Sequence, residues 1–108
     1  MDEILVLAEH RNEELRDITF ELFTAANALG TAHDLAVTGL LLGHEASSLA
    51  ERLQGACDTV LLMEDPELAQ FGAERYLAVM ETLMGERKPV LTLIGHTAAG
   101  MDLSLIHI

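Results

Sequence analysis

The residues best suited to chemistry in this chain follow two short apolar stretches. Glu9 and His10 come directly after residues 4–8, and a polar loop punctuated by glycine, residues 95–102, comes directly after residues 90–94. Short continuous apolar runs are typical of parallel strands buried on both faces. The carboxyl ends of such strands meet at one edge of a sheet, where α/β proteins hold ligands in a crevice. The candidate crevice residues are Glu9, His10, Gly95, His96, Thr97, Gly100 and Asp102.

The residue types of the loop at 95–102 leave two interpretations open. Glycine permits a close approach of the backbone to a ligand, and Thr97 with free amides at a helix N-terminus could hold a phosphate. Alternatively, the glycines serve only the turn from strand to helix, and Thr97 or Asp102 caps that helix. The first interpretation gives a nucleotide-binding site, whereas the second gives the loop no ligand.

Neither catalysis nor metal binding is expected from the remaining polar residues. Glu9 and His10 place a carboxylate beside a titratable imidazole, which suits acid–base chemistry. Adjacent residues at a strand end point to opposite sides, however, and no nucleophile accompanies the pair. No two histidines stand four residues apart, and the single cysteine, Cys57, has no partner for a zinc site or a disulfide. We therefore expect no catalytic residue and no metal.

Composition and charge indicate one globular domain in a reducing compartment. The 108 residues, half of them hydrophobic, suffice for one core. The formal net charge of −12 argues against binding to nucleic acid or to an anionic membrane surface and favours a basic or neutral partner. No apolar run reaches the roughly 18 to 20 residues that cross a bilayer, and the N-terminus lacks the basic residues of a signal peptide. With one cysteine, the expected location is cytoplasmic, without membrane insertion.

Apolar spacing predicts strands that alternate with helices along the chain. Helical periodicity runs over residues 15–29, and we expect Asp17 or Thr19 to cap this helix and Gly30 to end it. The order β-α-β-α-β-α-β gives an α/β fold with a parallel sheet, and the strand order 3-2-1-4 places the crevice between the first and fourth strands. The other expected elements are a charged loop at 9–14, strands at 4–8, 37–42, 60–63 and 90–94, and helices at 47–54 and from 73 to 84.

Several blocks of the sequence, in register, resemble the N-terminal domain of the electron transfer flavoprotein alpha subunit. Together they cover about residues 3–103, and their combination carries the resemblance. The chain departs from the family at Asp17, where proline is common, and completely after Leu103. The blocks are residues 4–12; Thr19, Glu21, Leu22, Thr24, Ala25, Ala26, Leu29 and Gly30; residues 56–65; and Gly95, His96 and Thr97 followed by Gly100 and Asp102.

The resemblance implies a fold, a function and partners. The fold would be a three-layer α/β/α domain of the adenine nucleotide alpha hydrolase-like or Rossmann-like kind, incomplete at its C-terminus. In this family an alpha and a beta subunit form a heterodimer whose FAD passes electrons from acyl-CoA or other dehydrogenases to an acceptor. FAD sits mainly on the C-terminal domain of the alpha subunit, so the resemblance favours the loop at 95–102 as a plain turn. We expect residues 1–103 to be a partial N-terminal domain that scaffolds the heterodimer, is no enzyme and holds no cofactor alone, and residues 104–108 to be a non-native tail.

Two other classes of protein remain as alternatives. A small nucleotide-binding module of the universal-stress type would use residues 95–100 for phosphate, but the second glycine and hydroxyl residue that complete its cradle are missing. A receiver-like phospho-acceptor domain needs acidic residues after the first and third strands, and Glu9 and Asp65 only loosely supply them. It also needs a lysine after the last strand, and residues 95–108 contain none. An open sheet that lacks a helix exposes apolar surface, so we expect marginal stability or association.

Overall fold

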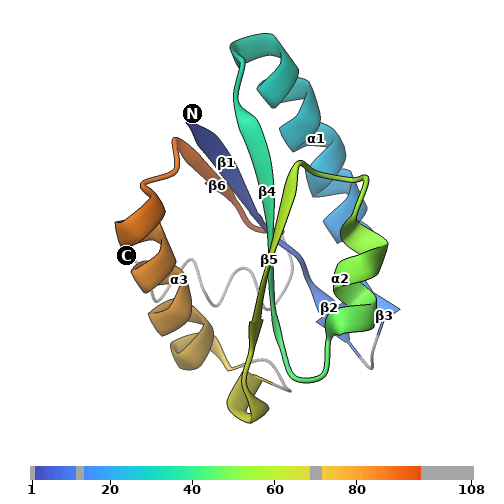
Figure 1. Cartoon of the computed structure of the whole chain (residues 1–108), viewed down its shortest axis with the longest axis vertical. Coiled ribbons are helices and arrows are strands. Elements are labelled where there is room, and N and C mark those ends of the chain that lie inside the picture. Colours follow the sequence, from blue (N-terminus) through green and yellow to red (C-terminus); the bar gives the residue numbers. More distant parts are fainter. Residues whose placement is uncertain (1, 12–13, 69–71, 96–108) are drawn as a thin grey trace.

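A parallel four-stranded sheet runs through the centre of the protein (Figure 1). The structure is a computed structural model that describes residues 2–11, 14–68 and 72–95. The sheet contains β1 (Glu3–Leu7), β4 (Ala36–Gly43), β5 (Thr59–Glu64) and β6 (Leu91–Leu93), and a separate hairpin contains β2 (His10–Arg11) and β3 (Glu14–Leu15). The helices are α1 (Asp17–His33), α2 (Ser47–Leu53) and α3 (Ala73–Arg87), with a 3-10 turn, η1, at Pro66–Leu68.

The strands of the sheet stand in the predicted order. Hydrogen-bonded neighbours run β5-β4-β1-β6, and all three pairings are parallel. Counted along the chain within this sheet, the strands are therefore third, second, first and fourth. The labels run higher because the β2–β3 hairpin follows β1, where a charged loop was predicted. That part of the prediction was wrong because paired segments of two residues are too short to show an alternating pattern.

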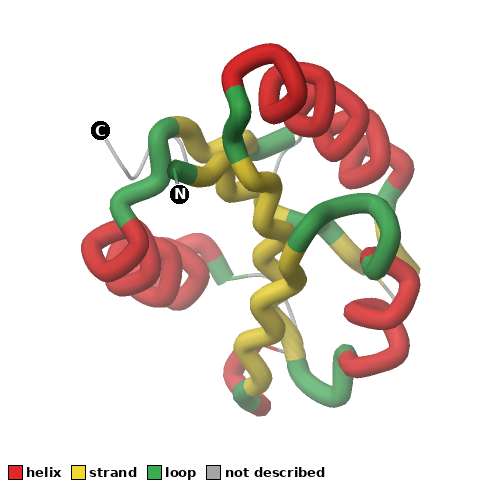
Figure 2. The backbone as a smooth tube through the Cα atoms, turned by 45° about the horizontal axis from the view of Figure 1, so that its top comes forward, coloured by secondary structure: helices red, strands yellow, loops and turns green. Residues whose placement is uncertain are grey.

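Helices cover both faces of the sheet, which confirms the three-layer α/β/α class (Figure 2). In Figure 1, α1 and α2 lie on one side of the sheet and α3 lies on the other. All five residues of β1 are buried, as are Val37 to Gly43 of β4, in agreement with the two-sided burial that their apolar runs predicted. The core under α1 and α2 includes Ile4, Phe23, Leu41, Leu49 and Leu53, and the core under α3 includes Leu7, Leu40, Leu42, Tyr76 and Met80.

A glycine on the central strand lets α1 approach the sheet closely. A Cβ at Gly39 would lie 2.7 Å from Cζ of Phe23 and 3.3 Å from Sγ of Cys57. The phenyl ring and the thiol therefore occupy the space that a side chain on β4 would need. Burial raises the pKa of the Cys57 thiol, so this group packs as a small, half-buried apolar side chain.

The first helix begins differently from its prediction. Neither Asp17 nor Thr19 is the cap: the N-cap position is Arg16, which has an extended backbone and makes no hydrogen bond from its side chain to the helix. The Thr19 hydroxyl is bound instead to the backbone of Glu9, ten residues away. A tertiary partner has thus replaced the local one on which the capping rule depends.

The same helix also continues past its predicted stop. Gly30 lies inside α1, which ends at Asp34 in the left-handed conformation (φ 56°), with the Asp34 N–H donating to the Gly30 carbonyl. Glycine is needed at position 30 for packing, because a Cβ there would lie 2.6 Å from the carbonyl oxygen of Leu35. Within the described part of the chain, neither α1 nor any other helix has the length and apolar character to cross a membrane.

A charged pair ties α3 to the amino end of the sheet. The Arg87 guanidinium donates to both carboxylate oxygens of Glu3, with Nε 2.6 Å from Oε1 and Nη2 3.0 Å from Oε2. The Thr38 hydroxyl donates to the same Oε2 at 2.6 Å. Glu3 is only 8% exposed, and its hydrogen bonds with Arg87 lower the pKa of the carboxyl in spite of burial, which acts to raise it. The pair therefore links the last turn of α3 to β1 and β4.

Replacing Arg87 by alanine is expected to reduce the free energy of unfolding by roughly 2 kcal/mol, because a buried carboxylate loses its charged partner. Arg75→Ala is the matched control on the same helix. The Nε of Arg75 lies 3.9 Å from Oε2 of Glu67, and both side chains are mostly exposed, so its loss should change stability by less than about 0.5 kcal/mol. Urea denaturation at neutral pH, followed by circular dichroism, measures both variants. Equal losses would show that the Glu3 pair has no special role.

Candidate functional site

Glu9 and Gly95 meet at the carboxyl edge of the sheet, as the two predicted lips of the crevice should. They follow β1 and β6, which are adjacent strands in the sheet. A Cβ at Gly95 would lie 2.7 Å from Oε2 of Glu9 and 3.0 Å from Cγ1 of Ile18. Glu9 is 8% exposed, so its carboxylate is a buried group packed against the Gly95 backbone. The absence of a side chain at position 95 is what makes room for it.

The backbone of Glu9 is held by three hydrogen bonds. The Thr19 hydroxyl donates to the Glu9 carbonyl at 3.0 Å and accepts the Glu9 N–H at 2.9 Å. The N–H of Arg16 donates to the same carbonyl at 2.8 Å. Thr19 is fully buried, and it lies in the first turn of α1. The start of α1 therefore fixes the position from which the Glu9 side chain enters the crevice.

His10 turns away from Glu9, as expected for successive residues at a strand end. Its Nε2 lies 2.6 Å from the carbonyl oxygen of Leu42. A carbonyl only accepts, so Nε2 donates the hydrogen of this bond. The ring also lies against Gly43, where a Cβ would be 3.3 Å from Nε2. The Glu9 carboxylate lies beside Gly95, after β6, whereas the His10 ring lies beside Gly43, at the end of β4. The two side chains therefore form no acid–base pair.

Tyr76 is the residue that sequence reasoning missed. Its hydroxyl donates to the Leu42 carbonyl at 3.0 Å, so this one oxygen accepts from both Tyr76 on α3 and His10 after β1. Burial, and secondly the negative charge of Glu9, raise the pKa of Tyr76 to about 12. The sequence predicted only that Tyr76 lies in a helix. Its partner is a backbone oxygen 34 residues away, for which the sequence offers no signal.

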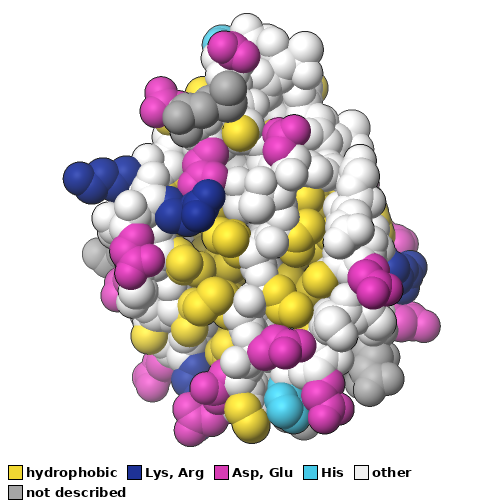
Figure 3. Space-filling view, in the orientation of Figure 1, with side chains coloured by type: hydrophobic (Ala, Val, Ile, Leu, Met, Phe, Trp, Pro, Cys, Tyr) yellow, Lys and Arg dark blue, Asp and Glu magenta, His cyan; other side chains and the backbone are white. Residues whose placement is uncertain are grey.

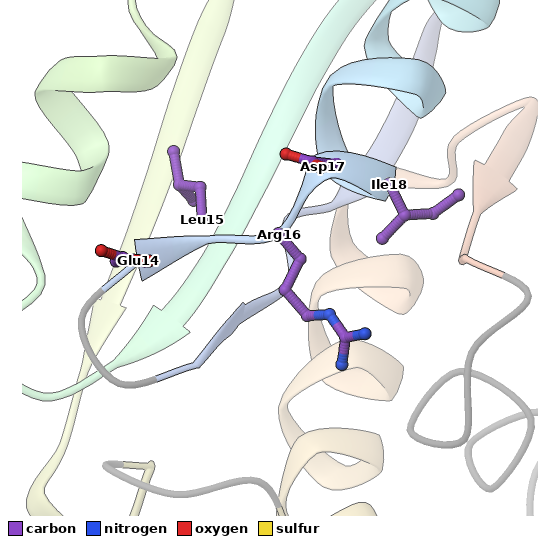
Figure 4. Close-up of a pocket in the computed structure, with 5 residues that line it drawn as sticks. All are labelled: Glu14, Leu15, Arg16, Asp17 and Ile18. Carbon is purple, nitrogen blue, oxygen red and sulfur yellow. The ribbon is translucent and has the colours of Figure 1, made fainter.

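An open hollow of about 420 Å³ lies beside this edge, at the turn from β3 into α1 (Figure 4). In Figure 4, Leu15 and Arg16 point in opposite directions. Ile18 also lines the hollow, and its side chain lies close to Gly95. Leu15 is buried, whereas Arg16 is exposed. The one cation in the lining is accompanied by two acidic residues, so the hollow selects no particular charge of ligand. The lining residues are Glu14, Leu15, Arg16, Asp17 and Ile18.

The described residues of the crevice do not fit the phosphates of a nucleotide or flavin. Phosphate sites in α/β folds use a glycine so that the ligand can approach the backbone. Here the space over Gly95 holds the buried carboxylate of Glu9, which would repel an anion. No group of three or more His, Cys, Asp or Glu able to hold a metal ion occurs among the residues that the structure describes. Four predicted crevice residues, His96, Thr97, Gly100 and Asp102, lie outside the described residues.

The parallel sheet and its two helical layers define a Rossmann-like α/β protein. Residues 4–105 match the electron transfer flavoprotein domain family, and the chain belongs to this family. The resemblance drawn from the sequence is thereby confirmed.

Curated relatives carry the names of electron transfer subunits. The chain is 38% identical over 102 residues to the electron transfer flavoprotein subunit alpha of Bacillus subtilis, which covers 94% of this chain and 31% of that protein. It is 34% identical to the acryloyl-CoA reductase electron transfer subunit beta of Anaerotignum propionicum, over 94% of this chain and 28% of that protein. It is 32% identical to the lactate dehydrogenase (NAD(+),ferredoxin) subunit LctC of Acetobacterium woodii, over 94% and 24% respectively. The chain thus spans less than a third of the length of these relatives.

Gly95→Ala is expected to lower the free energy of unfolding by about 1 to 3 kcal/mol, because its methyl group must displace the buried Glu9 carboxylate and press on Ile18. Gly85→Ala is the matched control: a Cβ at Gly85, inside α3, has nothing within 4 Å. Alanine there should stabilise the helix by up to about 1 kcal/mol. Thermal unfolding of the two variants and the parent measures both changes. A neutral Gly95→Ala would mean that Glu9 does not fill the crevice.

The titration of Tyr76 is expected to have its midpoint near pH 12 in the folded chain. The unfolded value is about 10, so the folded state retains its proton longer. The resulting stability is complete below pH 10 and is lost as the pH rises from about 10 towards 12. Tyr76 is the sole tyrosine and the chain has no tryptophan, so ultraviolet absorbance of the tyrosinate reports this group alone. The chain in urea supplies the unfolded reference, and a folded midpoint equal to it would contradict the burial of the hydroxyl.

Proposed function

We propose that the chain is the N-terminal part of an electron transfer flavoprotein alpha subunit. The protein would act in an FAD-containing heterodimer that carries electrons from dehydrogenases to an acceptor. The match of residues 4–105 to the electron transfer flavoprotein domain family is the observation that carries the proposal. The names of the curated relatives, an electron transfer flavoprotein subunit alpha among them, support it.

Within that heterodimer, we assign residues 1–103 a scaffolding role. The buried Glu9 carboxylate over Gly95 supports this assignment, because it occupies the place that a phosphate of a cofactor would need. The flavin would be held by another part of the complex. The chain itself would catalyse no reaction, and its partners would be the beta subunit and, through the complex, acyl-CoA or other dehydrogenases. A cytoplasmic location follows from the same proposal.

Coexpression with a beta subunit tests the function. The polypeptide that contains this chain, in its full reading frame, is expected to copurify with the beta subunit as a yellow complex whose visible spectrum is that of a flavin. Dehydrogenase and substrate should bleach that spectrum as the flavin is reduced. A reading frame that encodes an unrelated domain, or a complex without flavin, would overturn the proposal.

Calorimetric titration of the chain with ATP and AMP separates this function from a nucleotide-binding module. We expect no heat of binding, because the crevice presents a carboxylate to the phosphates. Micromolar affinity for either nucleotide would favour the small nucleotide-binding module and would count against the scaffolding role.

A further inference from the structure

The outer edge of β5 has backbone groups that no described strand pairs with. β5 lies at the end of the sheet, and its other edge pairs with β4. The N–H of Asp58, just before the strand, donates to Val37 of β4 at 2.9 Å. Alternate residues of a strand turn their amide groups to the same side. Leu61 and Met63 therefore direct their N–H and C=O groups away from β4, towards the outer edge.

The middle of this edge is apolar. Sheet edges are commonly protected by charged side chains, proline or a bulge; β5 has no proline, and its one charged residue is Glu64, at the last position. Val60, Leu61 and Leu62 are only half-buried, and Met63 is 38% exposed. In Figure 3, hydrophobic side chains gather over the region of β5, between α3 and α2, and both acidic and basic side chains border that region. An added strand would cover apolar surface as well as pair the free amides.

Three carboxylates stand near the two ends of β5, and two of them, those of Asp58 and Glu64, are bonded to β4 and to the segment that follows it. Asp58 precedes the strand, and Glu64 and Asp65 close it; all three are exposed. Each uses one oxygen to accept a backbone N–H, from Val37 at 2.8 Å, from Ala46 at 3.0 Å and from Glu67 at 2.9 Å respectively. Their charges are therefore held in place before any partner arrives.

These charges select the occupant. In an antiparallel pairing of two copies, Asp58 of one chain would stand beside Glu64 and Asp65 of the other, and the net charge of −12 on each chain would add to the repulsion. A partner with basic residues at both ends of an extended segment would instead form ion pairs there. The apolar middle of the segment would lie beside Val60 to Met63.

We propose that the open edge of β5 docks an extended segment of another protein, apolar in its middle and basic at both ends, as a fifth strand of the sheet. Backbone hydrogen bonds to Leu61 and Met63 provide the pairing, and the anchored carboxylates provide the choice of partner. The proposal does not depend on the electron-transfer function, because it rests on the edge of the sheet farthest from β6 and the crevice.

Two peptides that differ only in the charge of their ends test the proposal. Fluorescently labelled KVTVTVK is expected to bind the chain with micromolar to submillimolar affinity, and EVTVTVE is expected to bind at least roughly tenfold more weakly. Fluorescence anisotropy measures both affinities. Amide hydrogen exchange by NMR should show new protection at Leu61 and Met63 when KVTVTVK is bound.

Two variants locate the binding. Met63→Lys places a like charge on the docking edge and is expected to weaken KVTVTVK at least tenfold. Leu91→Lys is the matched control, since Leu91 is similarly exposed, at 40%, on the opposite edge strand β6, and it should leave the affinity unchanged. Circular dichroism checks that both variants fold. No binding up to millimolar peptide, equal affinity for the two peptides, protection at β6, or a dimer of the chain that Met63→Lys dissolves would each overturn the proposal.

Discussion

The structure depends on the burial of β4 on both faces. Val37 to Gly43 are all buried, so α1 and α2 must cover one face and α3 the other. β4 also extends beyond β1, whose last paired residue is Leu7, opposite Leu40. The carbonyl of Leu42 is therefore left without a strand partner, and a buried carbonyl must be satisfied. His10 and Tyr76 both donate to it, and in this way one backbone oxygen couples the segment after β1 to α3.

The same strand order brings the buried side chain of Glu9 next to Gly95. Adjacent β1 and β6 place Glu9 beside Gly95, and Thr19 anchors the backbone of Glu9 from the start of α1. A fold of this class commonly offers this position to the phosphates of a ligand. Here a side chain of the protein itself occupies it with a negative charge. The fold is thus shared with nucleotide-binding proteins, whereas the described glycine of this position, Gly95, is packed against an acidic side chain of the chain itself.

The parts of the fold that depend on burial were predictable from the sequence, and those that depend on tertiary contacts were not. Two-sided burial leaves continuous apolar runs, so the main strands and their order could be predicted from residues such as Ile4 and Leu41. Gly30 looked like a helix stop, although its real constraint is the carbonyl of Leu35. Thr19 looked like a cap, although its hydroxyl is used by Glu9. A hydroxyl such as that of Thr19 can bond either to its own helix or to a distant segment, and the residue type does not show which of the two it does.

The sheet edge at β5 and the crevice differ in how they could take part in recognition. In the crevice, the carboxylate of Glu9 is buried and packs against Gly95, so an anion approaching that part of the backbone would first have to displace it. At β5 the acidic groups are already held by backbone amides and the strand is part of a rigid sheet, so little conformational entropy is lost when a partner binds. Affinity would then come from backbone pairing and apolar contact, and specificity from the charges at the ends. On the proposal made above, this domain would hold a segment of another polypeptide at β5.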